Sequence, residues 1–519
     1  MNKIQIKQRS HSATVTADPG ETLHSILMRE GFYIPAPCGG NGTCGKCAVK
    51  TSEGIKLSCQ TPAIDGMEVY PPQSQAEAEK EAITVLDAYE TMRPLAHDSG
   101  IGYGIAIDIG TTTLAFELLD LAAGKRVCVH STANSQRSLG ADVVTRIKQA
   151  TEGAQGQLHK CIIDDLLHGI RSIIEKSGTQ PSEVTNIAIA GNTTMLHLLQ
   201  NMPCDTLGVF PFVPIDISMR RCVFADIFIC CEGARDNGQH APDALAAIDA
   251  SILDGLQSAN LLILPGISTF VGADITAGIL CCRSATAPSL LIDLGTNGEM
   301  ALFTPGRVLV TSTAAGPAFE AGNISQGTAS IPGAIAKVRY SPENHVFIYE
   351  TIDSHSPIGI CGTGVMDTAA ELIRHNLADE TGRLEDPYFD NGVAIAEGVI
   401  FTQKDMREVQ LAKSAVRSGI EILLDVAGYG YNDIGNVFLA GGFGHKMNMD
   451  SAVAMGIIPP ALADKVVTVG NTSLGGAAHV LLSTAAQADI QAIVSQATEI
   501  NLSTHPRFND LFMEHMMFE

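Results

Sequence analysis

The sequence lacks a hydrophobic run long enough to cross a membrane. Its longest candidate, residues 261–282, is interrupted by Pro265 and Asp274, whereas a spanning helix needs about 20 predominantly apolar residues. The first ten residues alternate polar and apolar side chains, which is typical of a strand and not of a signal peptide. We therefore expect a cytoplasmic protein that does not associate with membranes.

Positive charge is also scarce. The chain has 33 Lys and Arg residues against 56 Asp and Glu residues, a net charge of −23. Binding to nucleic acid phosphates needs clustered Lys and Arg, so we expect no nucleic acid partner. The balance is uneven, because residues 1–72 carry seven Lys/Arg and six Asp/Glu and nearly all the acidity lies in residues 73–519.

A disulfide framework is not expected either. The chain has thirteen Cys, an odd number, and no export signal. Nine of them are scattered without the spacing of metal ligands, and we expect these to be small buried hydrophobic residues.

The remaining four cysteines follow the spacing C-x5-C-x2-C-x11-C, at Cys38, Cys44, Cys47 and Cys59. Four thiolates complete a 2Fe–2S cluster. Glycines at positions 39, 40, 42 and 45 let the backbone wrap closely and direct N–H groups at the cluster sulfurs. A zinc site more often has two separated C-x2-C pairs, and only one is present here. The pattern favours 2Fe–2S over zinc or unligated thiols.

Residues 1–72 are expected to form one small domain. Alternating residues predict strands at Ile4–Ile6 and Ala13–Thr16, followed by an amphipathic helix over residues 21–31 and strands at Ala48–Thr51 and Met67–Tyr70. With the cysteine loop, this order resembles plant-type ferredoxins, with one extra residue between the first two cysteines. The resemblance implies an α+β fold of the β-grasp type.

The sequence pattern changes after residue 100. Residues 73–100 are polar and predict a linker, with a short helix over residues 82–91. From residue 101, strands that end in glycine alternate with helices, an α/β pattern. The strand–glycine theme recurs at five places, which predicts two similar halves: Ile105–Gly110, Ile187–Gly191, Leu290–Gly295, Val437–Gly442 and Val466–Gly470.

Two of these places carry an Asp followed by a turn of glycine and polar residues. The first has Asp108, then Gly110, Thr111, Thr112 and Thr113; the second has Asp293, then Gly295, Thr296, Asn297 and Gly298. Glycine lets the backbone approach a phosphate, and hydroxyl and N–H groups donate to it. The Asp side chains can hold Mg2+ through water. One such turn is an ordinary β-turn, but two copies after apolar strands favour phosphate binding.

A third element completes the pattern, the glycine turn Gly441, Gly442, Phe443 and Gly444 after an apolar strand. The order Asp–turn, Asp–turn, Gly-Gly resembles the actin, sugar kinase and heat-shock chaperone ATPase superfamily. The segments Gly191–Met195 and Gly470–Ala477 resemble its two connecting segments. The resemblance implies a two-lobed, ribonuclease-H-like ATPase over residues 101–519 that binds ATP and Mg2+.

Other candidate residues have two readings each. In this superfamily a carboxylate near the position of Asp274 often activates the attacking water, which makes Asp274 a candidate catalytic residue beside Asp108 and Asp293. The alternative is an Asp that accepts backbone N–H groups at a helix start. Lys413 and Arg417 share one helical face and either contact the adenosine or, as we expect, are solvated surface charges.

A 2Fe–2S domain joined to such an ATPase resembles the reductive activators of corrinoid proteins in methyltransferase systems such as O-demethylases. Segments at residues 134–147, 359–364, 402–410 and 502–508 also resemble this family. The resemblance implies ATP-dependent reduction of a corrinoid protein from Co(II) to Co(I), with the electron delivered through the cluster from a low-potential donor. A homodimer is compatible with this interpretation.

Three rival functions remain at the level of sequence. A sugar or acid kinase leaves the cluster without a role. Activators of 2-hydroxyacyl-CoA dehydratases use a similar ATPase but hold a 4Fe–4S cluster between two subunits and lack a ferredoxin-like domain. A redox-regulated ATPase or chaperone would use the cluster as a switch.

Overall fold

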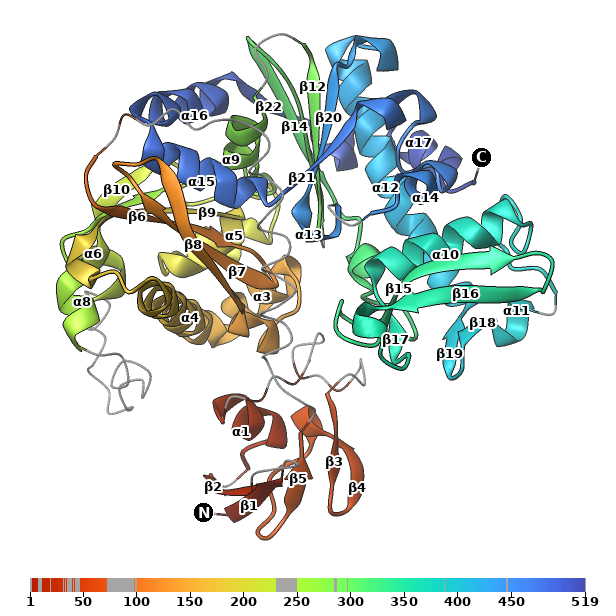
Figure 1. The fold of residues 1–519 in the computed structure, drawn as a ribbon, viewed down its shortest axis with the longest axis horizontal. Coiled ribbons are helices and arrows are strands. Elements are labelled where there is room, and N and C mark those ends of the chain that lie inside the picture. Colours follow the sequence, from red (N-terminus) through yellow and green to blue (C-terminus); the bar gives the residue numbers. More distant parts are fainter. Residues whose placement is uncertain are drawn as a thin grey trace. The chain divides into compact units, whose positions relative to one another are not determined.

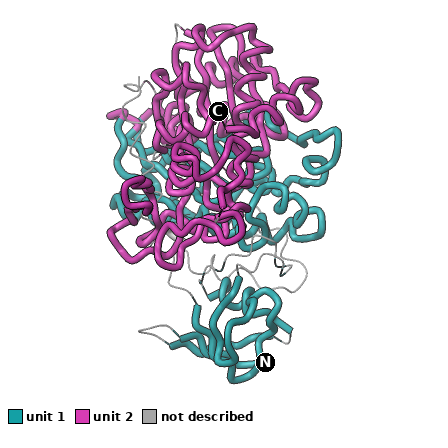
Figure 2. Tube along the Cα trace, turned by 90° about the vertical axis from the view of Figure 1, so that its right-hand side faces the viewer, with its two compact units in different colours: residues 1–80, 101–120, 125–263 teal, residues 81–100, 121–124, 264–519 magenta. Residues whose placement is uncertain are grey.

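The structure is a computed structural model, and its two compact units are described separately. The first unit comprises residues 1–80, 101–120 and 125–263; the second comprises residues 81–100, 121–124 and 264–519 (Figure 2). The structure describes residues 2–7, 12–18, 20–30, 32, 34, 40, 42, 47–71, 98, 100–229, 250–283, 287–295, 297–386, 388–444 and 447–518. The linker helix expected at residues 82–91 lies outside these ranges. No described helix combines the length and apolar character that crossing a membrane requires.

The N-terminal domain is a five-stranded sheet with one helix, and it contains the helix and the four strands that the sequence predicts (Figure 1). Its order is β2 (Ser12–Ala17), β1 (Asn2–Lys7), β5 (Glu68–Tyr70), β3 (Ala48–Thr51) and β4 (Gly54–Leu57). Strands β1 and β2 pair antiparallel, whereas β1 and β5 pair parallel, the mixed sheet of a β-grasp fold. Helix α1 (Leu23–Arg29) begins at Thr22, whose side chain accepts from the Ser25 N–H. Strand β4 was not predicted.

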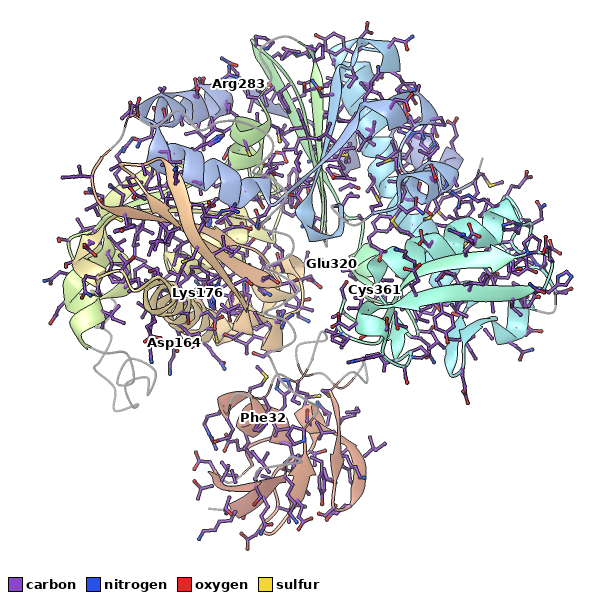
Figure 3. The ribbon with its side chains drawn as sticks, viewed as in Figure 1. Phe32, Asp164, Lys176, Arg283, Glu320 and Cys361 are labelled. Carbon is purple, nitrogen blue, oxygen red and sulfur yellow. The ribbon has the colours of Figure 1, made fainter. Side chains whose placement is uncertain are left out.

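The core of this domain consists of apolar side chains from both layers. Leu23, Ile26 and Leu27 of α1 are fully buried with Ile4 of β1. Phe32 packs against this core from just beyond the helix (Figure 3). Apolar residues alternate along the strands and recur at helical spacing in α1, so in both elements they lie on the face that is turned toward the other element.

The rest of the first unit is a six-stranded sheet with helices. Its order is β10 (Arg220–Val223), β11 (Asn260–Ile263), β9 (Val184–Gly191), β6 (Tyr103–Ile109), β7 (Thr113–Asp120) and β8 (Lys125–Ala133). Helix α4 (Gln155–Ser177) lies along β7 and β8. The shorter helices are α3 (Val143–Gln149), α5 (Thr193–Leu199), α6 (Phe224–Phe228) and α8 (Ala250–Leu256).

The second unit contains a sheet that matches the first in the order of five strands, and the sixth strand lies at opposite edges of the two sheets. Its order is β21 (Val466–Gly470), β20 (Asn436–Ala440), β12 (Ser289–Leu294), β13 (Gly298–Thr304), β14 (Arg307–Thr313) and β22 (Ala497–Glu499). In each sheet a three-stranded antiparallel meander begins with the Asp-bearing strand, which pairs parallel with a later strand on its other side. The prediction of two similar halves is confirmed.

Helices and two small sheets complete the second unit. The main helices are α9 (Ala273–Cys282), α10 (Gly362–Arg374), α12 (Gln403–Ala427), α15 (Thr472–Leu482) and α16 (Thr484–Gln496). The short ones are α11 (Tyr388–Asn391), α13 (Gly441–Gly444), α14 (Met449–Ala454) and α17 (Phe508–Glu514). The small sheets contain β15 (Ala334–Ser341), β16 (Val346–Thr351) and β17 (Gly359–Ile360), and β18 (Val393–Ala396) with β19 (Val399–Phe401).

The two connecting segments are also built alike. Each strand ends at a glycine, and the Asn that follows begins a helix: Asn192 accepts from the Thr194 N–H at 3.0 Å, and Asn471 from the Leu474 N–H at 2.8 Å. A side-chain acceptor at the first helical turn replaces the missing backbone partner. The repeated Gly-Asn-Thr sequence therefore forms a strand-to-helix turn capped by Asn in each half.

Candidate functional sites

Two of the four predicted cluster ligands are described, and they meet. The Sγ atoms of Cys47 and Cys59 lie 3.1 Å apart without a disulfide, and both residues are buried. Burial raises the pKa of the Cys59 thiol, and the neighbouring Cys47 thiol raises it further. The other two predicted ligands, Cys38 and Cys44, lie outside the described residues.

The glycines beside these thiols have the conformation that a cluster loop needs. Gly40 and Gly42 have φ of +83° and +73°, in the left-handed region that favours glycine. The Gly42 N–H donates to the Cys59 thiol and lowers its pKa, and the Gln60 side chain donates to the Gly40 carbonyl at 2.5 Å. Backbone N–H groups directed at sulfur stabilise thiolates bound to iron. The described residues therefore fit an iron–sulfur cluster.

The nine scattered cysteines differ in burial. Four of them, including Cys361 at the start of α10 (Figure 3), are buried as expected. Three others, Cys128, Cys161 and Cys222, are only partly buried, and Cys230 and Cys231 lie outside the described residues. Within the described part of the chain, no group of three or more His, Cys, Asp or Glu side chains is arranged to hold a metal ion.

The first Asp turn joins β6 to β7 in the first unit. Asp108 is partly buried near the end of β6, opposite Ala115 of β7. The Gly110 N–H donates to the Thr113 carbonyl at 3.1 Å and closes the turn. A Cβ atom at position 110 would lie 2.6 Å from that carbonyl oxygen, so this tight turn requires glycine. Thr111, Thr112 and Thr113 are half-buried along it.

The second Asp turn joins β12 to β13 and is one residue shorter. Asp293 pairs across the hairpin with Glu299, and the Gly295 N–H donates to the Asn297 carbonyl at 3.0 Å. Gly298 begins β13, and Thr296 lies outside the described residues. Both predicted Asp turns are thus hairpin turns at the ends of buried strands.

The Gly-Gly turn lies directly beside the second Asp turn. Strand β20 runs parallel to β12, with Ala440 level with Asp293, and Gly441 follows with φ of +86°. A Cβ atom at Gly441 would lie 2.7 Å from Asp293 Oδ1. Only glycine permits this approach of backbone to carboxylate. Gly442 and Gly444 lie in the short helix α13 with Phe443, whose side chain is not described.

A second carboxyl group, that of Glu299, lies across the hairpin from Asp293. Glu299 is 8% exposed, and its Oε1 accepts from the Asn297 side chain at 3.2 Å. Burial raises the pKa of Glu299 well above its usual range, and the negative charges of Asp274 and Asp293 raise it further. Sequence reasoning did not single out Glu299. Its signal was a carboxylate in an otherwise apolar strand directly after the turn.

Asp274 lies in the first turn of α9, as expected for an Asp that accepts backbone N–H groups at a helix start. Its Oδ1 accepts from the Ile275 N–H at 2.9 Å, so it satisfies a backbone donor at the helix start. It is also close enough to influence the pKa of Glu299 through its charge. Its location is compatible with both readings, and its catalytic role stays a prediction.

Lys413 and Arg417 are not solvated surface charges, and that expectation was wrong. Both are buried on α12, and Lys413 lies beneath the C-terminal residues. The Lys413 ammonium donates to the Met517 carbonyl and lies 4.4 Å from the centre of the Phe518 ring. Arg417 pairs with Glu421 at 2.7 Å. The sequence could not reveal the burial of Lys413, because the segment that covers it lies about a hundred residues further along the chain.

Comparisons with known proteins agree with this architecture. Residues 6–68 match a model described as a 2Fe-2S iron-sulfur cluster binding domain. Residues 103–234 match the RACo middle region, and residues 287–519 match the C-terminal domain of RACo, the ASKHA domain.

Individual relatives match along most of the chain. A protein of Eubacterium limosum named corrinoid activation enzyme RamQ is 27% identical, over 99% of this chain and 97% of its own length. A Methanosarcina barkeri protein named [Co(II) methylated amine-specific corrinoid protein] reductase is 27% identical, over 79% of this chain and 76% of its own length.

One solved structure shares the complete fold. A reductive activator for corrinoid, iron-sulfur protein is 23% identical, with a TM-score of 0.68 over 100% of this chain and 98% of its own. The 2Fe-2S model and the two RACo models follow one another along the chain in the order of the observed domains. Taken together, the three models show that the chain is similar to RACo proteins along most of its length.

Proposed function

We propose that this chain is an ATP-dependent reductive activator that returns a corrinoid protein from Co(II) to Co(I). Its partners are the corrinoid protein of a methyltransferase system and a low-potential electron donor, and it acts in the cytoplasm. We assign residues 1–72 to the cluster domain, residues 73–100 to the linker and residues 101–519 to the ATPase. Relatives named for corrinoid activation and for Co(II) corrinoid protein reduction support this assignment.

The observation that carries the proposal is the presence of two kinds of site in one chain. Cys47 and Cys59 converge beside left-handed glycines in the N-terminal domain, and paired Asp turns recur in the ATPase. A 2Fe–2S cluster bound there supplies one-electron transfer at low potential. A kinase would not need the first site, and a simple ferredoxin would not need the second.

The reaction balances as a one-electron reduction coupled to hydrolysis. The donor loses one electron, which passes through the N-terminal domain to cobalt and converts Co(II) to Co(I). In the same cycle, water cleaves ATP to ADP and phosphate. The coupling is conformational, because ATP that binds one conformer of the complex more tightly than another shifts the population toward it.

The ATPase residues have separate tasks in this proposal. The N–H and hydroxyl groups of residues 110–113 and 295–298 bind phosphates. Asp108 and Asp293 would hold Mg2+, which prefers oxygen ligands and would keep several of its waters. The glycine turn that begins at Gly441 lies beside the adenosine, and Asp274 activates the attacking water.

The test mixes the protein with a Co(II) corrinoid protein, a low-potential reductant and Mg–ATP without oxygen. The absorption band of Co(I) should grow, and should grow far less when ATP is omitted or replaced by a non-hydrolysable analogue. Cys44→Ala should abolish cobalt reduction and spare basal ATPase activity. Asp293→Ala should keep a reducible cluster and fail to produce Co(I).

Two results would contradict the proposal. One is stoichiometric zinc without sulfide in protein purified anaerobically. The other is intact cluster and ATPase activity with every candidate corrinoid protein of the organism left as Co(II). ATPase activity that follows the redox state of the cluster without net electron delivery would favour the redox-switch alternative.

A further inference from the structure

The segment of residues 134–146 contains three fully buried polar residues, Asn134, Gln136 and Arg146, and packs against the first Asp turn. It donates to three consecutive carbonyl groups of that turn. The Asn134 side chain donates to the Gly110 oxygen at 2.9 Å, and the Asn134 N–H donates to the Thr112 oxygen at 2.9 Å. The Arg146 Nη2 donates to the Thr111 oxygen between them.

These three bonds determine which way the peptide groups of the turn face. In a trans peptide the C=O of one residue and the N–H of the next point in opposite directions. Because the three carbonyls face residues 134–146, the N–H groups of residues 111–113 face away from that segment. A row of N–H groups directed to one side of a turn is the arrangement that binds phosphate oxygens.

Arg146 is buried completely, which is unusual for a guanidinium that is always charged. Its Nε donates to the Gly140 carbonyl at 2.8 Å, and its Nη1 donates to Gln136 Oε1 at 3.2 Å. Nη1 also lies 3.0 Å from the Met195 sulfur. These contacts fix the guanidinium plane, so its charge has a defined position beneath the turn.

Neighbouring residues of the same segment keep Arg146 in this position. A Cβ atom at Gly140 would lie 2.9 Å from the Arg146 nitrogen, so the loop can pass over the helix start only with glycine. Asp142 accepts from the Thr145 N–H at 2.7 Å and begins α3, which carries Arg146. Gln136 is fully buried and donates to the Leu158 carbonyl at 2.8 Å, which ties the segment to α4.

We propose that Arg146, with Asn134, is a positioning residue for the phosphates of ATP. Arg146 orients the peptide groups of residues 111–113 and places a positive charge behind the turn, without itself contacting the nucleotide. This inference rests on the proposed ATPase function and assigns a role to a segment whose family resemblance alone gave it none.

The experiment compares Arg146→Met, Arg146→Lys and Asn134→Ala for binding of ATP and of adenosine. If Arg146 positions the phosphate turn, Arg146→Met should weaken ATP binding by roughly 10- to 100-fold, the factor expected for loss of a charged hydrogen bond. Adenosine has no phosphate, so its affinity should stay near that of the unchanged protein. Arg146→Lys keeps the charge and should recover part of the loss, and Asn134→Ala should show a smaller loss.

Arg126→Met is the matched control. Arg126 is a largely buried arginine of the same unit, paired with the buried Glu117 at 2.8 Å, and it lies opposite Leu119, toward the end of the β7–β8 pair that is far from the turn. Its loss should lower the melting temperature and leave the ratio of ATP to adenosine affinity unchanged. A purely structural role for Arg146 would give the same result as this control and would overturn the inference.

The outcomes separate the inference from the function on which it rests. Failure of the unchanged protein to bind ATP would overturn the proposed function itself. Normal ATP binding by folded Arg146→Met, or equal losses for ATP and adenosine, would overturn the inference alone. If Arg146→Met does not fold, an unchanged affinity ratio in both Arg146→Lys and Asn134→Ala overturns it in the same way.

Discussion

The two Asp turns occupy equivalent places in two matching sheets, but their surroundings have opposite charge. Behind the first turn, the Arg146 guanidinium donates to a turn carbonyl. Beside the second, Glu299 lies near the charges of Asp274 and Asp293. Across the first hairpin Asp108 faces Ala115, whereas across the second Asp293 faces Glu299. The two equivalent turns therefore have different electrostatic surroundings.

Mg–ATP offers a reason for this difference. Its phosphates are anionic and its metal ion is cationic, so positively charged surroundings suit the phosphates and carboxylate-rich surroundings suit the metal ion. Oriented N–H groups above a buried cation suit phosphate. Closely spaced carboxylates repel one another until a cation neutralises them. On the proposed function, the first turn contributes mainly phosphate binding and the second mainly metal binding.

The strongest test of this division replaces the two Asp residues separately. Asp293→Ala should slow ATP hydrolysis on the order of a thousandfold, because loss of metal binding removes several kcal/mol of transition-state stabilisation. The Mg2+ concentration needed for half-maximal activity should rise more in Asp293→Ala than in Asp108→Ala. Steady-state hydrolysis measured across a magnesium titration checks both expectations.

The iron and sulfide content of the protein is the internal control for these two Asp variants. Iron and sulfide content should be unchanged in both, since neither residue belongs to the N-terminal domain. Cys59→Ala should do the reverse, losing the cluster with normal hydrolysis, whereas Cys281→Ala should affect neither. Normal ATPase activity in both Asp variants would show that the nucleotide site has been misplaced.

Asp274 is the next test, with an expected effect on the order of a hundredfold on kcat if it activates water. Its two readings separate with Asp274→Asn. Asparagine keeps an oxygen that can accept from the Ile275 N–H, so it should restore activity if Asp274 only satisfies the helix start. Asparagine cannot accept a proton, so a catalytic role predicts that Asp274→Asn is as slow as Asp274→Ala, with little change in ATP binding.

The sequence predicted the features that depend on local patterns. Alternation, glycine positions and the Asp–turn spacing were sufficient for the N-terminal hairpin, the two matching halves and the turns at Asp108 and Asp293. Each of these features was predicted from local patterns of about ten consecutive residues. At that length, backbone preferences and the spacing of apolar side chains determine the local structure directly. The cysteine spacing belongs to the same class, and Cys47 and Cys59 do converge.

Features that depend on distant contacts were missed. Arg146 donates to a carbonyl 35 residues away, and Lys413 to one 104 residues away. A charged residue on a helix is normally exposed, so the pattern alone favours solvent for both. Only the fold reveals that each is covered and has carbonyl partners. Glu299 was missed for a related reason, since its raised pKa arises from burial and from Asp274, 25 residues earlier in the sequence.

The smallest effect we expect concerns Glu299 and the stability of the second unit. Because the folded protein raises its pKa above the unfolded value, the folded state binds more protons than the unfolded state. The free energy of unfolding should therefore fall as the pH rises from about 4.5 toward the raised pKa. Glu299→Gln removes the titration but keeps the oxygen that accepts from Asn297. The variant should match the unchanged protein at acidic pH and exceed it by about 1–2 kcal/mol above neutrality.

Melting followed by circular dichroism between about pH 5 and 8 measures this difference. Ala115 occupies the corresponding position in the first unit, so Ala115→Glu is the reciprocal variant. If the two turns differ as argued, Ala115→Glu should lose stability as the pH rises, and added Mg2+ should reduce the advantage of Glu299→Gln. A pH profile of Glu299→Gln parallel to that of the unchanged protein would mean that Glu299 is ionised throughout. The second turn would then hold its carboxylates without the repulsion on which the contrast with the first turn depends.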